Sequence, residues 1–412
     1  MSDSLPARRP RVAVVTAVFP PSMGGSERYH FTTARALSAA AEVRVLTSEA
    51  SRAQGDPVRL PGVQVDYLAS ARTGRETRIR WGPLWRALRE FAPDAIWTNG
   101  PSATSDLAGL YARTHGVPWV VTYHADLDAG SVVRRVYTWA THRWMRKADR
   151  VIVQSEIYRD VERSRGLDAR RIVLAPPGPY LLDGSPPLLR ESERPTWTSP
   201  SPEHPLLFVG GLDPGHGYKR LDLQIDAVAA LDGVPPSVSL VVVGEGALRP
   251  SLEARVRRAG LTERVRFAGR LSDAELAAMF RRAWALVIPS NSSSEGFAVV
   301  ALEAAISGCP VVASAQVPGA RLLADGGGAI CYDAADPTAL VGALRMVLTA
   351  PDLRDRMAAA ALKASQAYRW TALVGSHIDP VLELARRHAQ HDGSADATPS
   401  KLPRSAPRAG PP

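Results

Sequence analysis

Two glutamates stand in an otherwise apolar, small-residue run, "SSSEGFAVVALEAAISGCPVVAS", at residues 292–314. Valine, leucine and isoleucine surround Glu303 in the sequence, and a buried carboxylate costs several kcal/mol unless hydrogen-bond donors surround it. Glu303 therefore needs a partner, either in the protein or in a ligand. Glu295 precedes the helix that this run predicts, and the free amides and the dipole at the N-terminus of that helix suit a ligand anion.

The spacing of the two glutamates leaves simpler interpretations open. Eight residues correspond to about 80° of rotation on a helix, so Glu295 and Glu303 need not face one partner. Glu303 could instead pair with an arginine of its own domain, and Glu295 could cap the helix.

Lys219 is one of only four lysines, at positions 147, 219, 363 and 401, against forty-six arginines. It lies in "FVGGLDPGHGYKRLD", a loop between a predicted strand and a helix. A lysine in that place is a suitable point charge for a diphosphate. The alternative is an ordinary solvated loop lysine.

Two further loops carry candidates. Gly24 and Gly25 in "FPPSMGGSERYH" permit close backbone approach before a helix, whose free N–H groups suit a phosphate or a sugar hydroxyl. His124 in "TYHAD" ends a predicted strand, from which it could reach a ligand. An ordinary turn and a structural histidine are the alternatives. "VVVGEGALRP" has Arg249 where a dinucleotide fingerprint has its third glycine, so it is an incomplete signal.

The elements that position these residues alternate between short apolar strands and helix-like stretches, which predicts an α/β fold with parallel sheets. We predict a first domain over 1–181, a linker over 182–205, a second α/β domain over 206–375, a helix over about 376–391 that packs back onto the first domain, and a disordered tail over 392–412. The expected strands are 11–19, 42–48, 95–99, 118–124, 150–155 and 171–178, then 206–212, 238–246, 264–271, 285–290, 310–314 and 328–333.

Parallel sheets bind ligands beyond the carboxyl ends of their strands, so two such domains facing each other predict one shared cleft.

Composition narrows the class of protein. A chain of 412 residues exceeds one ordinary core, and a formal charge of +9 favours anionic partners. Cys309 and Cys331 lie in or beside apolar segments, and the N-terminus has no recognisable secretory leader. Together these features indicate reduced thiols and a cytoplasmic protein. No window of about 20 residues is apolar enough to span a bilayer.

Taken together, the motifs resemble the retaining glycosyltransferases of family 4, which have the GT-B architecture of two facing Rossmann-like domains with a cleft between them. The resemblance covers about residues 11–390. Its most specific part is the pair of glutamates separated by seven residues, followed by "SGCPVVAS". Supporting motifs are "PPSMGGSERY", "TYHADL", "ADRVIVQSE", "LAPPG", the Lys219 loop, "VVGEGALR" and "YRW".

The resemblance implies a role for each candidate. Glu303 would hold the ribose of a nucleotide, and Glu295 would hydrogen-bond the donor sugar. Lys219 would balance the charge on the departing diphosphate, and His124 would contact the sugar from the opposite domain. The remaining donor-site residues implied are Gly24, Gly25, Gly244, Arg270, Leu271, Gly296, Phe297 and Ala298.

One position departs from the family. Its members usually carry an arginine a few residues before the lysine, where this chain has Gly211. Loss of one such donor costs about 3 kcal/mol of transition-state stabilisation. Either the enzyme is slower, or His216 or Arg220 supplies the charge, or the chain is not catalytic. We expect it to be active, because Glu295, Glu303 and Lys219 are all present.

We expect a nucleotide-diphosphate sugar as donor substrate, and neither a cofactor nor a metal, because no suitable Asp-x-Asp or His/Cys cluster occurs. The acceptor would be a hydroxyl of a lipid-linked saccharide, a lipid or a small metabolite. Basic, aromatic stretches at 78–91 and 132–150 suit an anionic membrane surface, which would place the protein peripherally on the inner face of the cell membrane. Amphipathic helices with buried aromatics are the alternative.

Other functions share this architecture. A sugar-nucleotide epimerase or phosphorylase would use the same cleft without net transfer, and a non-catalytic nucleotide-sugar-binding subunit would depend on a partner. Nucleic-acid binding ranks last, because the aromatics form no stacking platform. The sequence leaves open the donor sugar, the base, the acceptor and the oligomeric state.

Overall fold

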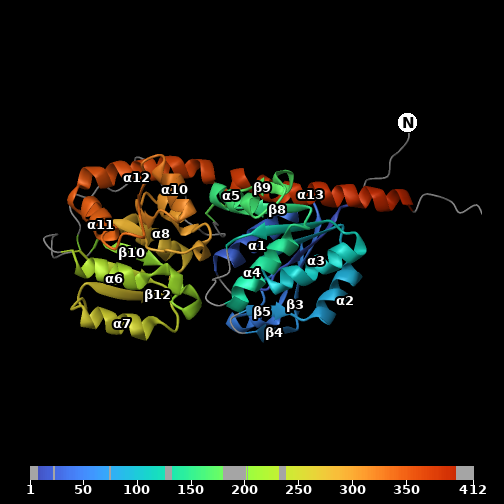
Figure 1. The fold of residues 1–412 in the computed structure, drawn as a ribbon, viewed down its shortest axis with the longest axis horizontal. Helices are drawn as coiled ribbons and strands as arrows, with labels where there is room; N and C mark the ends of the chain where they lie inside the picture. The colour runs from blue at the N-terminus through green and yellow to red at the C-terminus, as the bar shows by residue number, and fades with distance from the viewer. Residues whose placement is uncertain are drawn as a thin grey trace, which may run out of the picture.

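The computed structural model describes residues 8–21, 24–73, 76–125, 132–179, 201, 203–231 and 238–395. Most of the predicted linker and the tail from residue 396 lie outside the described residues. Two sheet-containing units lie side by side (Figure 1).

The first unit contains a seven-stranded parallel sheet in the order β3-β2-β1-β6-β7-β8-β9. Its strands are β1 Arg11–Val15, β2 Glu42–Ser48, β3 Val63–Leu68, β6 Ala95–Gly100, β7 Trp119–Tyr123, β8 Arg150–Val153 and β9 Ile172–Leu174. The strands β4 Ser70–Thr73 and β5 Glu76–Ile79 form a separate antiparallel hairpin. Apolar side chains fill the central strands, as expected for strands covered on both faces.

The second unit contains a six-stranded parallel sheet in the order β12-β11-β10-β13-β14-β15. Its strands are β10 Leu206–Val209, β11 Leu240–Val243, β12 Val265–Gly269, β13 Ala285–Ile288, β14 Val311–Ser314 and β15 Ala329–Tyr332. The strand order reverses beside β10, as it does beside β1 in the first sheet. Each reversal leaves a crevice at the carboxyl ends of two neighbouring strands, where ligands bind in such folds.

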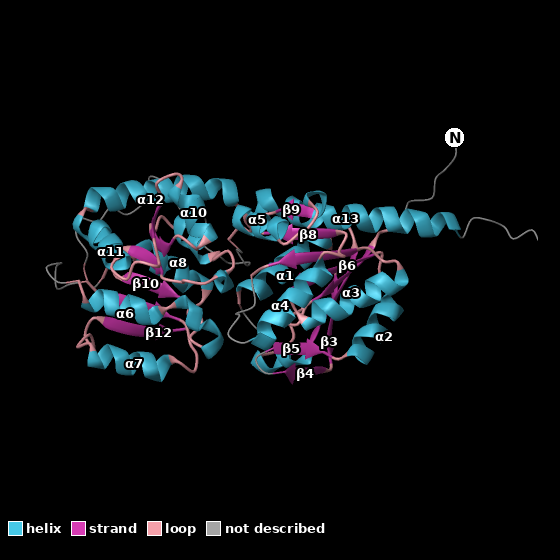
Figure 2. Cartoon of the chain, viewed as in Figure 1, coloured by secondary structure: helices cyan, strands magenta, loops and turns pink. Residues whose placement is uncertain are grey.

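Helices cover the faces of both sheets (Figure 2). The first unit contributes α1 Gly25–Leu37, α2 Trp81–Phe91, α3 Ala103–His115, α4 Val132–Met145 and α5 Glu156–Ser164. The second contributes α6 Leu221–Ala229, α7 Arg249–Arg258, α8 Asp273–Arg282, α9 Val300–Ile306, α10 Pro318–Ala324, α11 Ala339–Thr349 and α12 Pro351–Ser365. The short 3₁₀ helices η1 Glu49–Gln54, η2 Ala169–Arg171, η4 Pro214–Lys219, η5 Ser293–Glu295 and η6 Gln366–Tyr368 lie in connections.

The last helix, α13 Trp370–Ala395, runs along the first unit (Figure 1). Its buried residues Val381, Leu382 and Ala385 share one core cluster with β1. His377 fixes it further, since one ring nitrogen contacts the Tyr29 hydroxyl at 3.1 Å and the other contacts the Pro176 carbonyl at 3.1 Å. The helix begins six residues before the predicted start and continues to Ala395, beyond the predicted beginning of the tail.

The α/β class and the twelve predicted strands are confirmed, although several strands end earlier than predicted. β3 and the β4–β5 hairpin were not predicted. β3 is an edge strand whose residues are mostly only partly buried, and polar Gln64 and Asp66 interrupt its apolar pattern.

Candidate active site

Lys219 and Glu295 meet at the crevice of the second sheet. Lys219 ends η4, which follows β10, and Glu295 ends η5, which follows β13. The Lys219 Nζ atom lies 2.7 Å from Glu295 Oε1. β10 and β13 are neighbours in the sheet, so their following loops share one edge. The structure therefore joins two predicted catalytic residues that are 76 positions apart in the chain.

The Glu295 carboxylate is held on both of its oxygens. Oε1 accepts from Lys219, and Oε2 accepts a short hydrogen bond from the Ser290 hydroxyl. Its side chain is only 3% exposed. α9 begins at Val300, five residues later, so Glu295 precedes a helix as predicted, but the alternative capping role is wrong because the N-cap residue is Val299. Glu295 is instead fixed in one orientation by a lysine and a serine.

The Lys219 ammonium stays charged despite its surroundings. Burial opposes the charge, but the nearby Glu295 carboxylate and the Tyr218 ring outweigh it and raise the pKa of Lys219. A cation is thus maintained at the carboxyl end of β10 near neutral pH.

Glu303 lies in the first turn of α9, with buried alanine, leucine and isoleucine side chains around it. Among the described residues its carboxylate has no hydrogen-bond or ion-pair partner. Burial raises the pKa of Glu303, Arg28 of α1 opposes this shift, and Asp273 of α8 adds to it. The alternative of a salt bridge to an arginine of its own unit is therefore wrong. A ligand remains as the expected partner.

His124 follows β7 in the first unit and packs edge-on against Tyr29, with ring centroids 4.9 Å apart. Burial lowers its pKa to about 3, and the nearby His30 lowers it further, so the imidazole is neutral. Its Nε2 atom is buried and has no hydrogen-bond partner in the described part of the chain. The side chain of nearby Gln154 partly offsets the lowering of the His124 pKa. A neutral ring with a free nitrogen can bind a sugar hydroxyl.

The segment from Gly296 to Ala298 touches the first unit. Gly296 has φ +65°, and a Cβ atom placed on it would lie 2.8 Å from the His124 carbonyl oxygen. Phe297 and Ala298 are buried, and Ala298 also has a left-handed backbone with φ +58°. His124 and the Glu295 loop therefore face each other across the two units.

Gly24 and Gly25 lie at the start of α1, as predicted. Gly24 is the N-cap, and a Cβ atom on it would collide with the Glu27 carboxylate at 2.6 Å. Nothing lies within 4 Å of a Cβ atom placed on Gly25. Contacts of these two glycines with a phosphate or a sugar hydroxyl stay a prediction.

The structure gives Gly244 a packing role. Its φ is +140°, and a Cβ atom on it would lie 1.9 Å from the Gly210 carbonyl oxygen. It therefore allows the loop after β11 to approach the loop after β10. Arg270 is exposed and Leu271 is partly buried in the connection between β12 and α8. Contacts of these three residues with a donor stay a prediction.

Two residues near the site were not predicted. Arg28 of α1 pairs with Asp273 of α8, so the ion pair bridges the two units beside Glu303. Arg28 stands in the quoted "GGSERY" motif, which is the signal that could have identified it. Ser290 carries no such signal, because its role depends on the fold of the loop after β13.

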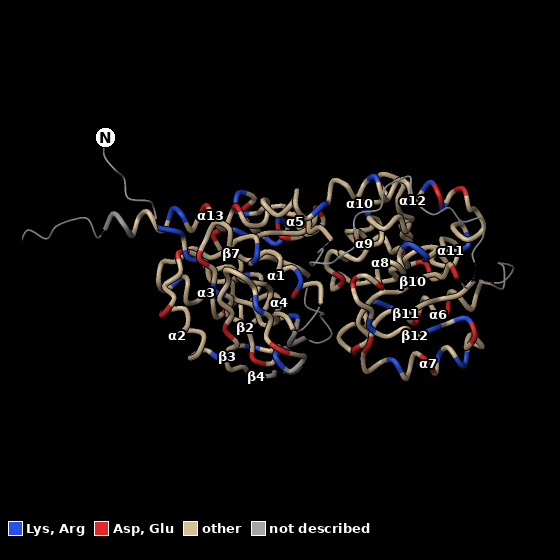
Figure 3. The backbone as a smooth tube through the Cα atoms, turned by 180° about the vertical axis from the view of Figure 1, so that it is seen from behind, with Lys and Arg blue, Asp and Glu red and all other residues tan. Residues whose placement is uncertain are grey.

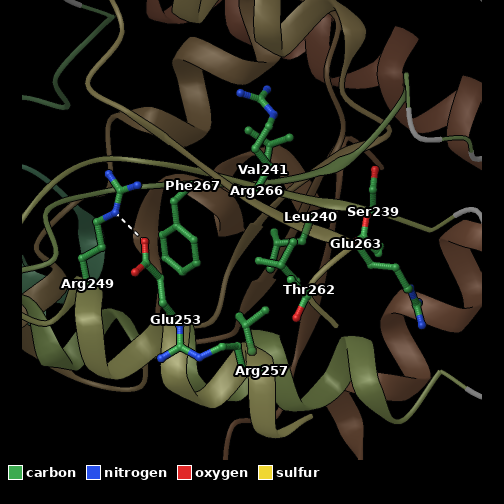
Figure 4. A pocket seen from close by; sticks show the side chains of 13 residues that line it. Ser239, Leu240, Val241, Arg249, Glu253, Arg257, Thr262, Glu263, Arg266 and Phe267 are labelled. Atoms are coloured by element: carbon green, nitrogen blue, oxygen red, sulfur yellow. Dashed lines mark hydrogen bonds and ion pairs between the residues drawn. The ribbon is translucent and has the colours of Figure 1, made fainter. Parts of the chain in front are cut away.

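One pocket of about 580 Å³ lies elsewhere, between α7 and the strands β11 and β12 (Figure 4). Two of its charged lining residues pair with each other, since Arg249 Nε lies 2.8 Å from a Glu253 oxygen. This pocket holds none of the predicted site residues.

The described residues contain no group of three or more His, Cys, Asp or Glu side chains placed to hold a metal ion. None of the described helices combines the length and the apolar character needed to cross a bilayer.

The sequence of this chain is similar to those of known glycosyltransferases. Residues 190–364 match the family model described as "Glycosyl transferases group 1", and residues 24–178 match "Glycosyl transferase 4-like domain". Phosphatidyl-myo-inositol mannosyltransferase of Mycobacterium leprae is 30% identical over 359 residues, which cover 82% of this chain and 90% of that protein.

Two further similarities extend over nearly the whole chain. D-inositol 3-phosphate glycosyltransferase of Xylanimonas cellulosilytica is 29% identical over 423 residues, covering 92% of this chain and 98% of that protein. Among solved structures, sucrose-phosphate synthase of Thermosynechococcus elongatus has a TM-score of 0.69 at 20% identity, covering 94% of this chain and 100% of that one. The structural likeness concerns the fold.

Proposed function

Because this chain belongs to the glycosyl transferases of group 1, family 4, with the GT-B fold, we propose that it moves a hexose-type sugar from a nucleoside-diphosphate donor to a hydroxyl of an anionic acceptor, with retention of anomeric configuration. The observation that carries this proposal is the Lys219–Glu295 pair at the crevice between β10 and β13. It offers a fixed cation to a leaving diphosphate and an oriented carboxylate to the sugar beside it.

The residues around that pair complete a donor site in this proposal. The Glu303 carboxylate, which has no partner among the described residues, accepts hydrogen bonds from the two ribose hydroxyls. The neutral His124 ring, on the first unit, hydrogen-bonds a hydroxyl of the donor sugar. Lys219 neutralises charge that grows on the diphosphate as the glycosidic bond breaks. Closing the two units around the donor excludes water, which favours transfer to the acceptor over hydrolysis.

The anionic acceptor is proposed from chemistry on the first unit. A pocket of about 420 Å³ beside α4 is lined by Arg135, Thr138, Trp139, His142, Arg143, Arg146 and Arg165. Arg165 already pairs with Glu162 at 2.9 Å and Arg146 donates to the Arg165 carbonyl oxygen at 3.1 Å, so Arg135 and Arg143 are the guanidinium groups that favour a phosphate-bearing ligand here. The similar proteins from Mycobacterium and Xylanimonas are named for phosphatidyl-myo-inositol and D-inositol 3-phosphate, both of which carry phosphate.

The same helix supports contact with an anionic membrane surface, which would bring a lipid acceptor within reach. Val136 is 60% exposed and Trp139 is 65% exposed. Exposed apolar and aromatic side chains flanked by arginines are typical of interfacial helices.

Substitution K219A tests the function. Removing the cation should lower kcat by about a hundredfold to a thousandfold, because one preorganised charge at the leaving group is lost. Transfer from UDP-, GDP- and ADP-sugars would be measured by product analysis, which also separates transfer from epimerisation. K363A is the matched control, since Lys363 is exposed on α12. Unchanged turnover of a folded K219A protein would remove Lys219 from the reaction.

We also propose that transfer needs no divalent metal, because the Lys219 cation can stabilise the charge on the leaving diphosphate. Turnover should stay within about twofold after EDTA treatment and dialysis, as measured with the preferred donor. Complete loss, restored by adding Mg²⁺ or Mn²⁺, would contradict this.

A further inference from the structure

The loop after β10 shows what occupies the space of the missing arginine. A Cβ atom placed on Gly211 would lie 2.7 Å from Nδ1 and 2.9 Å from Cε1 of His216. These distances are shorter than van der Waals contact, so no side chain at position 211 is compatible with the observed imidazole. Gly211 and His216 are therefore one structural feature.

The preceding glycine has the same relation to the catalytic lysine. A Cβ atom on Gly210 would lie 2.6 Å from Cδ of Lys219. Two consecutive glycines thus accommodate two basic side chains of η4. The charged groups that act on His216 are Lys219, Asp213 and Glu295, so its ring lies within electrostatic range of the Lys219–Glu295 pair.

Arg220, the other candidate for the missing charge, is already engaged. Its Nε and Nη2 atoms each lie 3.0 Å from Asp222 oxygens, and its φ of +52° marks the turn into α6. Moving this guanidinium to the crevice would break both hydrogen bonds. His216 has no such ion pair in the described part of the chain, and its ring lies against the Gly211 backbone.

We propose that His216 is the second positive contact of the donor diphosphate and takes the place of the usual arginine, with Gly211 providing its space. This inference rests on the proposed function. In the free protein, burial and then Lys219 lower the pKa of His216, while Asp213 and Glu295 oppose the shift. The imidazole is therefore mainly neutral at pH 7, and a bound diphosphate raises its pKa. Donor binding then takes up a proton.

Proton uptake on donor binding can be measured, and a histidine with a purely structural role would not cause it. A thermal-shift screen with UDP-glucose, GDP-mannose and ADP-glucose first identifies the probe that binds. Calorimetry in two buffers of different ionisation enthalpy then counts protons, and the diphosphate diester contributes none because it stays ionised near neutral pH. Affinity should be highest below the pKa of the free imidazole and fall by up to about tenfold per pH unit as pH rises towards the pKa of the bound form.

Three variants isolate the residue. H216Q should abolish the proton uptake and lower kcat/KM for the donor by about tenfold to a hundredfold. G211A should do the same, because its methyl group displaces the imidazole. G211R/H216G restores the family arrangement in space vacated by the ring, and it should recover most of the activity. H115Q, on the exposed end of α3, is the matched control and should behave as wild type.

The outcomes separate this inference from the proposed function. If wild type binds and transfers, and H216Q keeps both its kcat/KM and its proton uptake, the role of His216 is overturned while the glycosyltransferase proposal stands. If wild type neither binds nor uses any of the three donors, both fall. Melting temperatures of each variant identify misfolding, and H216Q alone suffices should G211R/H216G fail to fold.

Discussion

Glu303 and Glu162 are two poorly accessible carboxylates with opposite surroundings. Glu162 is 1% exposed and is satisfied by His142 Nδ1 at 3.1 Å and Arg165 Nη1 at 2.9 Å. Glu303 has no such partner among the described residues, and burial raises its pKa. A satisfied acid stabilises its surroundings, whereas an unsatisfied one in a crevice costs stability and is a candidate for function.

Substitution E303Q should separate the effect of Glu303 on stability from its effect on nucleotide binding. A raised folded-state pKa means that the folded protein binds the proton more tightly than the unfolded chain does. The charged form therefore costs stability at neutral pH, and this cost disappears as pH falls through the folded pKa. E303Q should leave the melting temperature at pH 7.5 unchanged or higher, and abolish most of the increase that the donor nucleotide causes.

Substitution E162Q is the contrast, because it breaks a buried pair and should destabilise the fold by roughly 3 kcal/mol without affecting the ribose site. A full nucleotide-induced rise in the melting temperature of E303Q would show that Glu303 does not hold the ribose.

At the scale of elements, the sequences of α2 and α4 both left open whether their aromatic residues pack in the core or face a membrane surface. Trp85 of α2 packs against Tyr111 and His115, with ring centroids 4.9 Å away in each case, so this helix uses its aromatics mainly for packing. In α4, Trp144 packs towards Trp119, but Trp139 points outward. Figure 3 shows basic and acidic residues along both units. α4 differs from α2 both in its exposed Trp139 and in having three arginines and no acidic residue.

Vesicle flotation tests the membrane surface. Wild type should float with phosphatidylcholine/phosphatidylglycerol vesicles at low salt but not with phosphatidylcholine alone. R135Q/R143Q should weaken this partition by about thirtyfold, because each arginine near an anionic surface contributes about 1 kcal/mol. R257Q/R258Q on α7 removes the same charge from the other unit and should have little effect. Protein that stays at the bottom of the gradient in low salt would end the idea.

At the scale of the whole molecule, the crevices of the two sheets can form one binding site only because the two units face each other. Contacts across them include the Gly296–His124 approach and the Arg28–Asp273 ion pair. Both side chains of that pair are partly exposed, at 22% and 25%. A pair of this kind contributes about 1 kcal/mol or less and is weakened by salt. It therefore biases the closed arrangement without locking it.

Substitution R28Q should shift the free protein towards open arrangements. We expect a larger radius of gyration by small-angle scattering without donor, and a donor KM raised by about threefold to fivefold. The reversed pair R28D/D273R should restore both values, and R170Q, which removes an exposed pair within one unit, is the control. Identical scattering and KM for R28Q would mean that the pair does not hold the units together.

The sequence predicted much of the architecture because buried parallel strands are near-continuous apolar runs such as "LLFVGG" and "SLVVVG". It failed for β3, where edge exposure permits Gln64 and Asp66. Glu303 was recognised because a carboxylate in an apolar helix contradicts its surroundings. Ser290 was missed, since a serine in a loop contradicts nothing.

The sequence by itself determined the α/β class, the family and the identity of the chemically capable side chains, because these depend on local periodicity and on residue type at fixed spacing. Only the tertiary structure decided that Lys219 binds Glu295, that Arg220 is paired with Asp222, and that Glu303 has no partner among the described residues. Those facts depend on which strands become neighbours in a sheet and on how the two units contact each other. The local sequence around residues that are far apart in the chain does not indicate such contacts.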